Sequence, residues 1–462
     1  MSTRREVLLG AAGVALASAA PPKRELRSLR AAIRGEVLAP GDRGYDAARR
    51  LYDKRFDGIR PPAVARPRDA ADVRALVRWA ADHDARLVPR SGGHAYNGAS
   101  TSRQAFVVDM RHLDGVRSGR VARVGPAARN IDVYAALARQ GRGWASGSCP
   151  TVGAGGLALG GGMGLAGRRH GLTCDTLVAI DVVTADGHLR RVSADNRPDL
   201  FWALRGGGGN FGIVTALHLR TFAARRAAWF FASYPRSSAA EALAAWDDLA
   251  PGAPPELTSI FTLPAGTGRV TALGQYLGPE RALRRLVAPL ERVPSATLTA
   301  GTSDYLALQR RWAGCADGGL ATCWRSTRSS FAAASVYVSR RLSPAGRRAF
   351  VDASEHATLI LDAYGGAIND LGPDATAFVH RDARFSVQIL AYDPIARAAP
   401  AVRRAHAAVA PHGNGQAYQN YADPSLRDAQ RAWYGSNLKR LVAVKREVDP
   451  DERFRLRQGI PG

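Results

Sequence analysis

Three glycine-rich segments in the first half of the chain constrain its fold more than any other feature. They are Arg90-Ser91-Gly92-Gly93-His94-Ala95-Tyr96, the stretch from Gly147 to Gly164, and the stretch from Arg205 to Val214. Glycine lets successive backbone N–H groups face a ligand and lets the chain approach it closely. Three such segments predict one large, elongated, anionic ligand. Their spacing fits neither a P-loop nor a GxGxxG at the start of a Rossmann helix.

The sequence around these segments alternates short apolar runs with amphipathic stretches. Residues 69–83 predict a helix with an apolar face, because apolar positions recur at helical spacing. Strands are predicted at 86–89, 106–110, 177–184 and 385–390, and further helices at 237–249 and 344–363. The chain is therefore expected to have an α+β fold.

Length and composition indicate an ordinary globular protein of two or three domains. The chain has 462 residues, of which 46% are hydrophobic and 23% are charged. Its formal net charge of +24 suggests a polyanion partner, yet all but four of the 64 basic residues are Arg, in a chain rich in Ala and Gly. This skew is typical of GC-rich coding. No basic run is interleaved with aromatic residues, so nucleic acid is not expected as a partner.

The first twenty residues have the pattern of a signal peptide. Arg4 and Arg5 precede an apolar run that ends in small residues near Ala19-Ala20, where cleavage is expected. The paired arginines predict the twin-arginine export machinery, which carries folded proteins, and hence an extracellular or cell-envelope location. The alternatives are an ordinary Sec signal or an N-terminal anchor. No other stretch reaches the ~18 apolar residues of a membrane helix, so no span is expected in the mature form.

The four cysteines divide by their surroundings. Cys315 and Cys323 close a short loop and are either a disulfide, which suits an exported protein, or two unrelated thiols. Cys174 is expected to be a small buried residue. There is no cluster at zinc spacing, so no metal is expected. Cys149 lies in the second glycine-rich segment and His94 in the first, and a thiolate and an imidazole can both attach covalently to an electrophilic cofactor ring.

These segments, in this order, resemble the berberine-bridge-enzyme-like subgroup of the vanillyl-alcohol-oxidase flavoproteins. The segment Tyr418-Gln419-Asn420-Tyr421-Ala422-Asp423 likewise looks like the closing Tyr-x-Asn-Tyr-x-Asp segment of that family. The resemblance covers nearly all of the mature chain. It implies a two-part PCMH-type FAD-binding domain, and a substrate domain with an antiparallel sheet covered by helices. The implied division is a signal at 1–20, an N-terminal helical lead-in at 21–56, the FAD-binding domain at 57–223, the substrate domain at 224–414, and a C-terminal segment at 415–462 that returns to the FAD domain.

The resemblance also implies bicovalent FAD. By it, His94 bonds the flavin 8α-methyl carbon and Cys149 bonds flavin C6. Two attachment points would hold the ring against an open cleft and raise its reduction potential. The other positions expected to bind the cofactor are Arg90, Ser91, Gly92, Gly93, Tyr96, Val152, Gly153, Gly155, Gly156, Gly160, Gly161, Gly209, Asn210, Gly212, Ile213, Val214 and Asn420.

The base for alcohol oxidation must come from elsewhere in the chain. Tyr418 and Tyr421 are the candidates, and the sequence favours Tyr421 only slightly. Ser386 and Gln388 share one side of a strand that resembles the flavin-facing strand of the family, and Gln388 is expected to hydrogen-bond the substrate. Several relatives carry Lys or Glu where this chain has Ser386. Serine cannot act as their base, so amine oxidation and ring closure are not favoured here.

The expected reaction is oxidation of an alcohol or lactol carbon of a sugar, an oligosaccharide or a glycosylated natural product. Val152 stands where oxidases of the family tend to carry Val, which favours O2 as the acceptor, with H2O2 as the product. One alternative is a tailoring oxidase or dehydrogenase of a secondary metabolite that uses another acceptor. The other is a secreted protein that binds polyanions on an inactive flavin fold.

Overall fold

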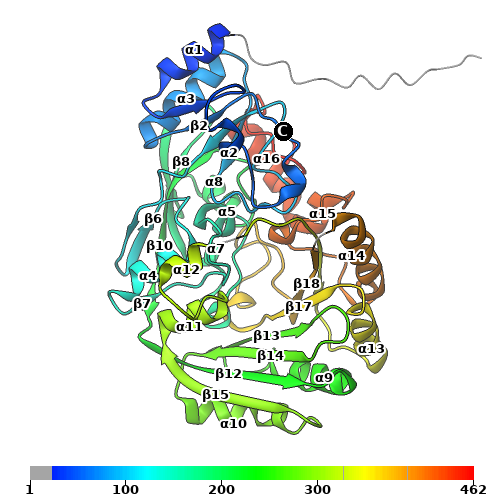
Figure 1. The fold of residues 1–462 in the computed structure, drawn as a ribbon. Coiled ribbons are helices and arrows are strands. Elements are labelled where there is room, and N and C mark those ends of the chain that lie inside the picture. Colours follow the sequence, from blue (N-terminus) through cyan, green and yellow to red (C-terminus); the bar gives the residue numbers. More distant parts are fainter. Residues whose placement is uncertain (1–22, 326, 393) are drawn as a thin grey trace, which may run out of the picture.

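The computed structural model describes residues 23–325, 327–392 and 394–462, so the predicted signal peptide lies outside the described residues. Figure 1 shows two parts. The N-terminal half (blue to cyan) and the C-terminal helices (red) form one part. The middle of the chain (green to orange) forms the other, around a large sheet.

A four-stranded sheet in the first part presents the first glycine-rich segment at the end of a strand. Helix α3 (Ala70–Asp82) connects two of its strands, and the Asp69 side chain caps the helix by accepting hydrogen bonds from the backbone N–H groups of Ala71 and Asp72. Val73, Leu76, Val77 and Ala80 are buried on one face, which confirms the predicted helix. The strand order is β1 (Glu36–Leu38), β2 (Val64–Arg66), β4 (Phe106–Asp109) and β3 (Leu87–Arg90).

The lead-in expected at 21–56 is not entirely helical. It contains α1 (Lys23–Ala32) and α2 (Tyr45–Ala48), but also strand β1, which pairs antiparallel with β2. Val37 and Leu38 in this strand are buried. The lead-in therefore belongs to the four-stranded sheet, because its two apolar residues complete the edge of that sheet.

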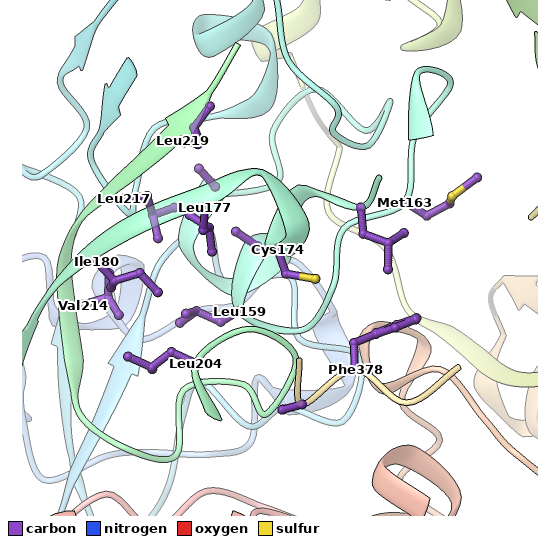
Figure 2. Packing of buried hydrophobic residues seen from close by; sticks show 14 of the residues in the cluster. Leu159, Met163, Cys174, Leu177, Ile180, Leu204, Val214, Leu217, Leu219 and Phe378 are labelled. Atoms are coloured by element: carbon purple, nitrogen blue, oxygen red, sulfur yellow. The ribbon is translucent and has the colours of Figure 1, made fainter. Parts of the chain in front are cut away.

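The third glycine-rich segment leads directly into Ile213–Arg220, a strand of a five-stranded sheet, and the second contains the short helix Ala154–Leu159, which packs in the core beneath this sheet. The core beneath it contains Leu159, Cys174, Ile180 and Val214, which Figure 2 shows close together, and Cys174 is fully buried, as predicted. The strand order is β5 (Val116–Arg117), β6 (Val121–Val124), β10 (Ile213–Arg220), β8 (Leu177–Val183) and β9 (Leu189–Ser193), and the connecting helices include α4 (Asn130–Ala138), α5 (Ala154–Leu159), α6 (Gly167–His170), α7 (Thr173–Thr176) and α8 (Pro198–Ala203).

The second part is built on a seven-stranded sheet whose neighbouring strands are all antiparallel. One face packs against helices, which confirms the expected antiparallel sheet with a helical cover. The strand order is β15 (Thr297–Asp304), β12 (Arg226–Tyr234), β14 (Val270–Tyr276), β13 (Leu257–Leu263), β17 (Thr358–Ala363), β18 (Phe385–Tyr392) and β16 (Phe331–Val338), and the helices are α9 (Ala239–Leu249), α10 (Glu280–Glu291), α13 (Pro344–Ala353) and α14 (Ile395–Val409).

The helix predicted at 344–363 is wrong in its second half. Helix α13 ends at Ala353, and Thr358–Ala363 forms strand β17 in the interior of the sheet. The apolar run is compatible with either structure, and pairing with β13 on one side and β18 on the other decides for the strand. In a strand the side chains alternate, so Leu361 faces the helices while Asp362 faces the opposite side.

The C-terminal segment returns to the first part of the molecule. Helices α15 (Ala429–Tyr434) and α16 (Leu438–Val448) lie there, and the Lys445 ammonium donates a hydrogen bond to the Asn210 carbonyl oxygen at 2.8 Å. Cys315 and Cys323, between α11 (Tyr305–Trp312) and the end of α12 (Leu320–Trp324), form a disulfide. Within the described ranges, no helix is long and apolar enough to span a bilayer, and no cluster of three or more His, Cys, Asp or Glu side chains is arranged to hold a metal ion.

Candidate active site

A cavity of about 330 Å³ lies where the glycine-rich segments, the seven-stranded sheet and the C-terminal segment meet. Ile260 and Asp362 of the sheet line it together with most of the predicted site residues. These are Arg90, Ser91, Gly92, Gly93, His94, Tyr96, Cys149, Val152, Gly153, Gly155, Gly156, Gly160, Gly209, Asn210, Gly212, Val214, Tyr418, Asn420 and Tyr421.

Three predicted site residues do not line this cavity. Ile213 is fully buried in the core beneath the first sheet, and Gly161 packs against the Phe378 ring. Gln388 donates a hydrogen bond from its amide nitrogen to the Tyr96 hydroxyl at 2.7 Å. It is therefore placed to orient the Tyr96 hydroxyl in the cavity wall, and its contact with a substrate stays a prediction.

The first two glycine-rich segments touch through their backbones. A Cβ atom on Gly92 would lie 2.5 Å from the Gly153 amide nitrogen, so only glycine fits there. This contact brings the His94 imidazole to 3.2 Å from the Thr151 hydroxyl (Nε2 to Oγ1). His94 and Cys149 thus lie on adjoining loops that line one cavity.

The His94 ring is held in a neutral state. It stacks on the Tyr52 ring with 4.4 Å between centroids, and burial lowers the pKa of His94 to about 4. At neutral pH the imidazole is therefore uncharged and keeps a nucleophilic nitrogen. Cys149 is exposed toward the cavity, and the surrounding walls raise the pKa of its thiol by desolvation.

Helix α4 fixes the loop that carries Cys149. The Asn130 side-chain amide donates to the Cys149 carbonyl oxygen at 3.1 Å, and the Asn130 and Ile131 backbone N–H groups donate to the carbonyl oxygens of Val152 and Pro150. Because the first N–H groups of a helix have no partner inside it, this loop satisfies them. The Cys149 backbone is thereby held in one place.

The other cavity residues suit an anionic dinucleotide such as FAD. The Arg90 Nη2 nitrogen and the Ser100 hydroxyl are buried without a hydrogen-bond partner among the described residues, and both residues line the cavity. Desolvation lowers the pKa of Arg90 to about 10, so the guanidinium stays charged at neutral pH. Guanidinium and hydroxyl groups are ordinary partners of phosphate oxygens. The site therefore fits FAD.

The two candidate tyrosines have different surroundings. The Tyr418 hydroxyl accepts hydrogen bonds from the Gly162 backbone N–H at 2.8 Å and from the Asn420 side-chain amide at 2.9 Å. The Tyr421 hydroxyl instead donates to Oδ2 of Asp362 at 3.3 Å. Burial raises the pKa of both phenols, so each is protonated at neutral pH.

Asp362 is the site residue that the sequence analysis missed. Its side chain is 5% exposed, and desolvation raises the pKa of the carboxyl to about 7, against the hydrogen bonds from Tyr421 and Ser386 that lower it. A single carboxylate in the apolar run Thr358–Ala363 was the available signal. As part of a helix this carboxylate would not face the cavity, and only the strand conformation of the run brings it there.

Comparison with known proteins agrees with this geometry. A family model described as "FAD binding domain" matches residues 61–193, and one described as "Berberine and berberine like" matches residues 417–461. The chitooligosaccharide oxidase of Gibberella zeae is 31% identical over 97% of this chain and 96% of its own length. The xylooligosaccharide oxidase of Thermothelomyces thermophilus is 30% identical over 87% of each chain.

Solved structures show the same fold. BBE-like 1 of Physcomitrella patens superposes with a TM-score of 0.89 at 30% identity, covering 94% of this chain and 99% of its own. The glucooligosaccharide oxidase of Acremonium strictum gives a TM-score of 0.87 at 27% identity, covering 96% and 99%. The resemblance drawn from the sequence is confirmed. The chain belongs to the berberine-bridge-enzyme-like family of FAD-linked oxidoreductases.

Proposed function

We propose that the protein is an oligosaccharide oxidase that takes a hydride from an alcohol or lactol carbon of a sugar and passes the electrons to O2. The observation that carries this proposal is the hydrogen-bonded pair of Tyr421 and Asp362 in the wall of the cavity that His94 and Cys149 also line. The oligosaccharide oxidases among the relatives support the substrate class.

His94 and Cys149 are the residues that would attach FAD covalently. The neutral His94 imidazole is a nucleophile, and the exposed Cys149 thiol lies on a loop held by α4. A solved neighbour is described as carrying a 6-S-cysteinyl, 8α-N1-histidyl FAD, which supports attachment through these two residue types. When bound, the flavin supplies the hydride acceptor of the reaction.

Tyr421 and Asp362 would remove the hydroxyl proton of the substrate. As the substrate hydroxyl gives its proton to the Tyr421 oxygen, the Tyr421 proton passes along the existing hydrogen bond to Oδ2 of Asp362. A carboxyl with a pKa of about 7 can accept this proton and release it again near neutral pH. The Tyr418 hydroxyl already accepts two hydrogen bonds, which supports a positioning role for it.

Dioxygen as the acceptor and export of the protein are parts of the same proposal. Val152 lines the cavity, and the oxidases among the relatives support O2. The disulfide between Cys315 and Cys323 supports folding or residence in an oxidising compartment. Replacing both Arg4 and Arg5 by Lys should abolish export of the flavin-bearing protein if the twin-arginine machinery carries it. Continued export would point to the Sec route.

A substrate screen tests the function. The purified protein is mixed without air with chito-, xylo- and gluco-oligosaccharides, and flavin absorbance is followed. We expect at least one series to bleach the flavin, and air to restore the colour with one equivalent of H2O2. Failure of every oligosaccharide, with bleaching by glycosylated natural products, would establish the tailoring oxidase instead. Colour restored only by a quinone or dye would refute O2 as the acceptor.

A further inference from the structure

The face of the seven-stranded sheet that carries Asp362 extends well beyond the cavity. In register with Asp362 on successive strands lie Ile260, Leu273, Phe231 and Thr299. Because neighbouring strands lie about 4.8 Å apart, this row runs about 14 Å from Asp362 to Phe231. Ile260 also lines the cavity, so the row begins at the reaction site and leads away from it.

On this face the row runs outward over side chains that are partly exposed. Phe231 is 38% exposed, and Ile260, Leu273 and Ile360 are half-buried. Within the described ranges none of these four side chains joins a hydrophobic core. Their strand neighbours on the opposite face, such as Phe230, Phe261, Ala272 and Leu361, are fully buried beneath the helices. Ile260, Leu273, Phe231 and Ile360 thus form an apolar strip beside the cavity. Such a strip is typical of a ligand-binding surface.

Helix α11 borders the strip on one side. The Arg311 guanidinium lies 3.9 Å from the centroid of the Trp229 ring, and Trp312 donates from its indole nitrogen to the Gln275 side-chain oxygen at 3.3 Å. Figure 1 shows α11 near one end of the strands. Trp229 is two residues from Phe231, and Gln275 is two residues from Leu273, so all four side chains lie on the same face of the sheet. The sheet therefore forms the base of the strip, and α11 forms one side of it.

The apolar side chains of the strip are neutral, with the Asp362 carboxyl at the cavity end and the Arg311 guanidinium over Trp229 at the border with α11. Ile360 is in register with Thr262, Thr271 and Ser233 on the successive strands. At the far end of this second row, Arg269 donates a hydrogen bond to the Ser233 hydroxyl at 2.8 Å. Apolar side chains alternate with hydroxyl groups. This surface matches a neutral sugar chain, whose rings present C–H faces and whose edges carry hydroxyls.

We propose that this strip is a platform for the sugar units remote from the reacting one, and that the Phe231 ring stacks on an outer pyranose. This inference rests on the proposed function. Continuity with the cavity through Ile260 and the neutral, mixed apolar and hydroxyl surface together select an oligosaccharide over a charged polymer. The platform runs across the strands, so longer oligosaccharides gain contacts that a disaccharide does not reach.

The test is a chain-length series. Wild-type protein, Phe231→Ser and Phe231→Trp are compared on di- to hexasaccharides of the series that bleaches the flavin. We expect Phe231→Ser to raise KM increasingly with chain length, by about three- to tenfold for the longest, with little change in kcat, because the ring contributes binding and no chemistry. Phe231→Trp should keep the low KM of the long substrates. Leu189→Ser, at a residue 44% exposed on the other sheet, is the matched control and should leave every KM unchanged.

The outcomes separate this inference from the function on which it rests. Bleaching of the wild-type flavin by oligosaccharides supports the function, whatever the variants do. A KM change that is equal at all chain lengths, or absent, overturns the platform while the function stands. If no oligosaccharide bleaches the wild-type flavin, the function fails and the platform fails with it.

Discussion

The Tyr421 hydroxyl donates a hydrogen bond to Oδ2 of Asp362 at 3.3 Å, across 59 positions of sequence. Asp362 comes from an interior strand of the seven-stranded sheet, and Tyr421 from the C-terminal segment that crosses back to the first part of the molecule. The proton-accepting pair therefore forms only when this segment has returned. The active site is therefore complete only with the C-terminal segment in place.

Asp362→Asn should slow flavin reduction without preventing substrate binding. The amide keeps the shape of the carboxylate but accepts a proton poorly, so we expect the reduction rate to fall about 100-fold. Rapid mixing without air measures this rate. Ser386→Ala is the control, because it removes one hydrogen bond to Asp362 and leaves the carboxylate, and it should change the rate much less. An unchanged rate in Asp362→Asn would remove Asp362 from the mechanism.

The pH dependence of reduction follows from the raised pKa of Asp362. The carboxyl must be ionised to accept the Tyr421 proton, so the rate should rise with pH through about 7 and level off above it. An ordinary aspartate would give this rise near pH 4. Rates measured between pH 5 and 9 locate the inflection, and Asp362→Asn should lack it. An inflection that persists in Asp362→Asn would assign it to another group.

We expect Tyr421 to act in the proton transfer and Tyr418 to stabilise the fold around the site. Tyr421→Phe removes the hydroxyl that faces Asp362, and we expect a loss in reduction rate of about 10²- to 10⁴-fold with an unchanged melting temperature. Tyr418→Phe removes the acceptor of the Gly162 N–H and one of the two acceptors of the Asn420 amide, which should cost about 1–3 kcal/mol of the free energy of unfolding. Flavin reduction and denaturant unfolding measure the two effects. The opposite result would make Tyr418 the base.

The contact between the first two glycine-rich segments should be intolerant of any side chain. Gly92→Ala places a methyl group 2.5 Å from the Gly153 amide nitrogen and should push the His94 loop away from the Cys149 loop. We expect a lower flavin content per polypeptide and a lower melting temperature. Gly115→Ala, where nothing lies within 4 Å of the added methyl, should behave as wild type. Full flavin loading of Gly92→Ala would show that the contact is not needed.

Local motifs made much of the cofactor site predictable from sequence. Glycines and a reactive side chain within a few positions, as around His94 and Cys149, identify a loop without knowledge of the rest of the fold. Asp362 could not be predicted as a site residue, because an isolated apolar run fits a helix and a strand equally well. The strand forms through pairing with residues more than twenty positions away in the sequence. The Phe231 strip depends on register across four strands, which no local pattern contains.

Acid precipitation of the purified protein tests most directly whether one cofactor joins the two loops at the centre of the site. We predict that the yellow colour stays with the denatured polypeptide, and that digestion yields one flavin-bearing species containing both the His94 and Cys149 peptides. In Cys149→Ala the flavin should remain on the His94 peptide alone. Colour that passes entirely into the acid supernatant of the wild-type protein would contradict covalent attachment at either residue.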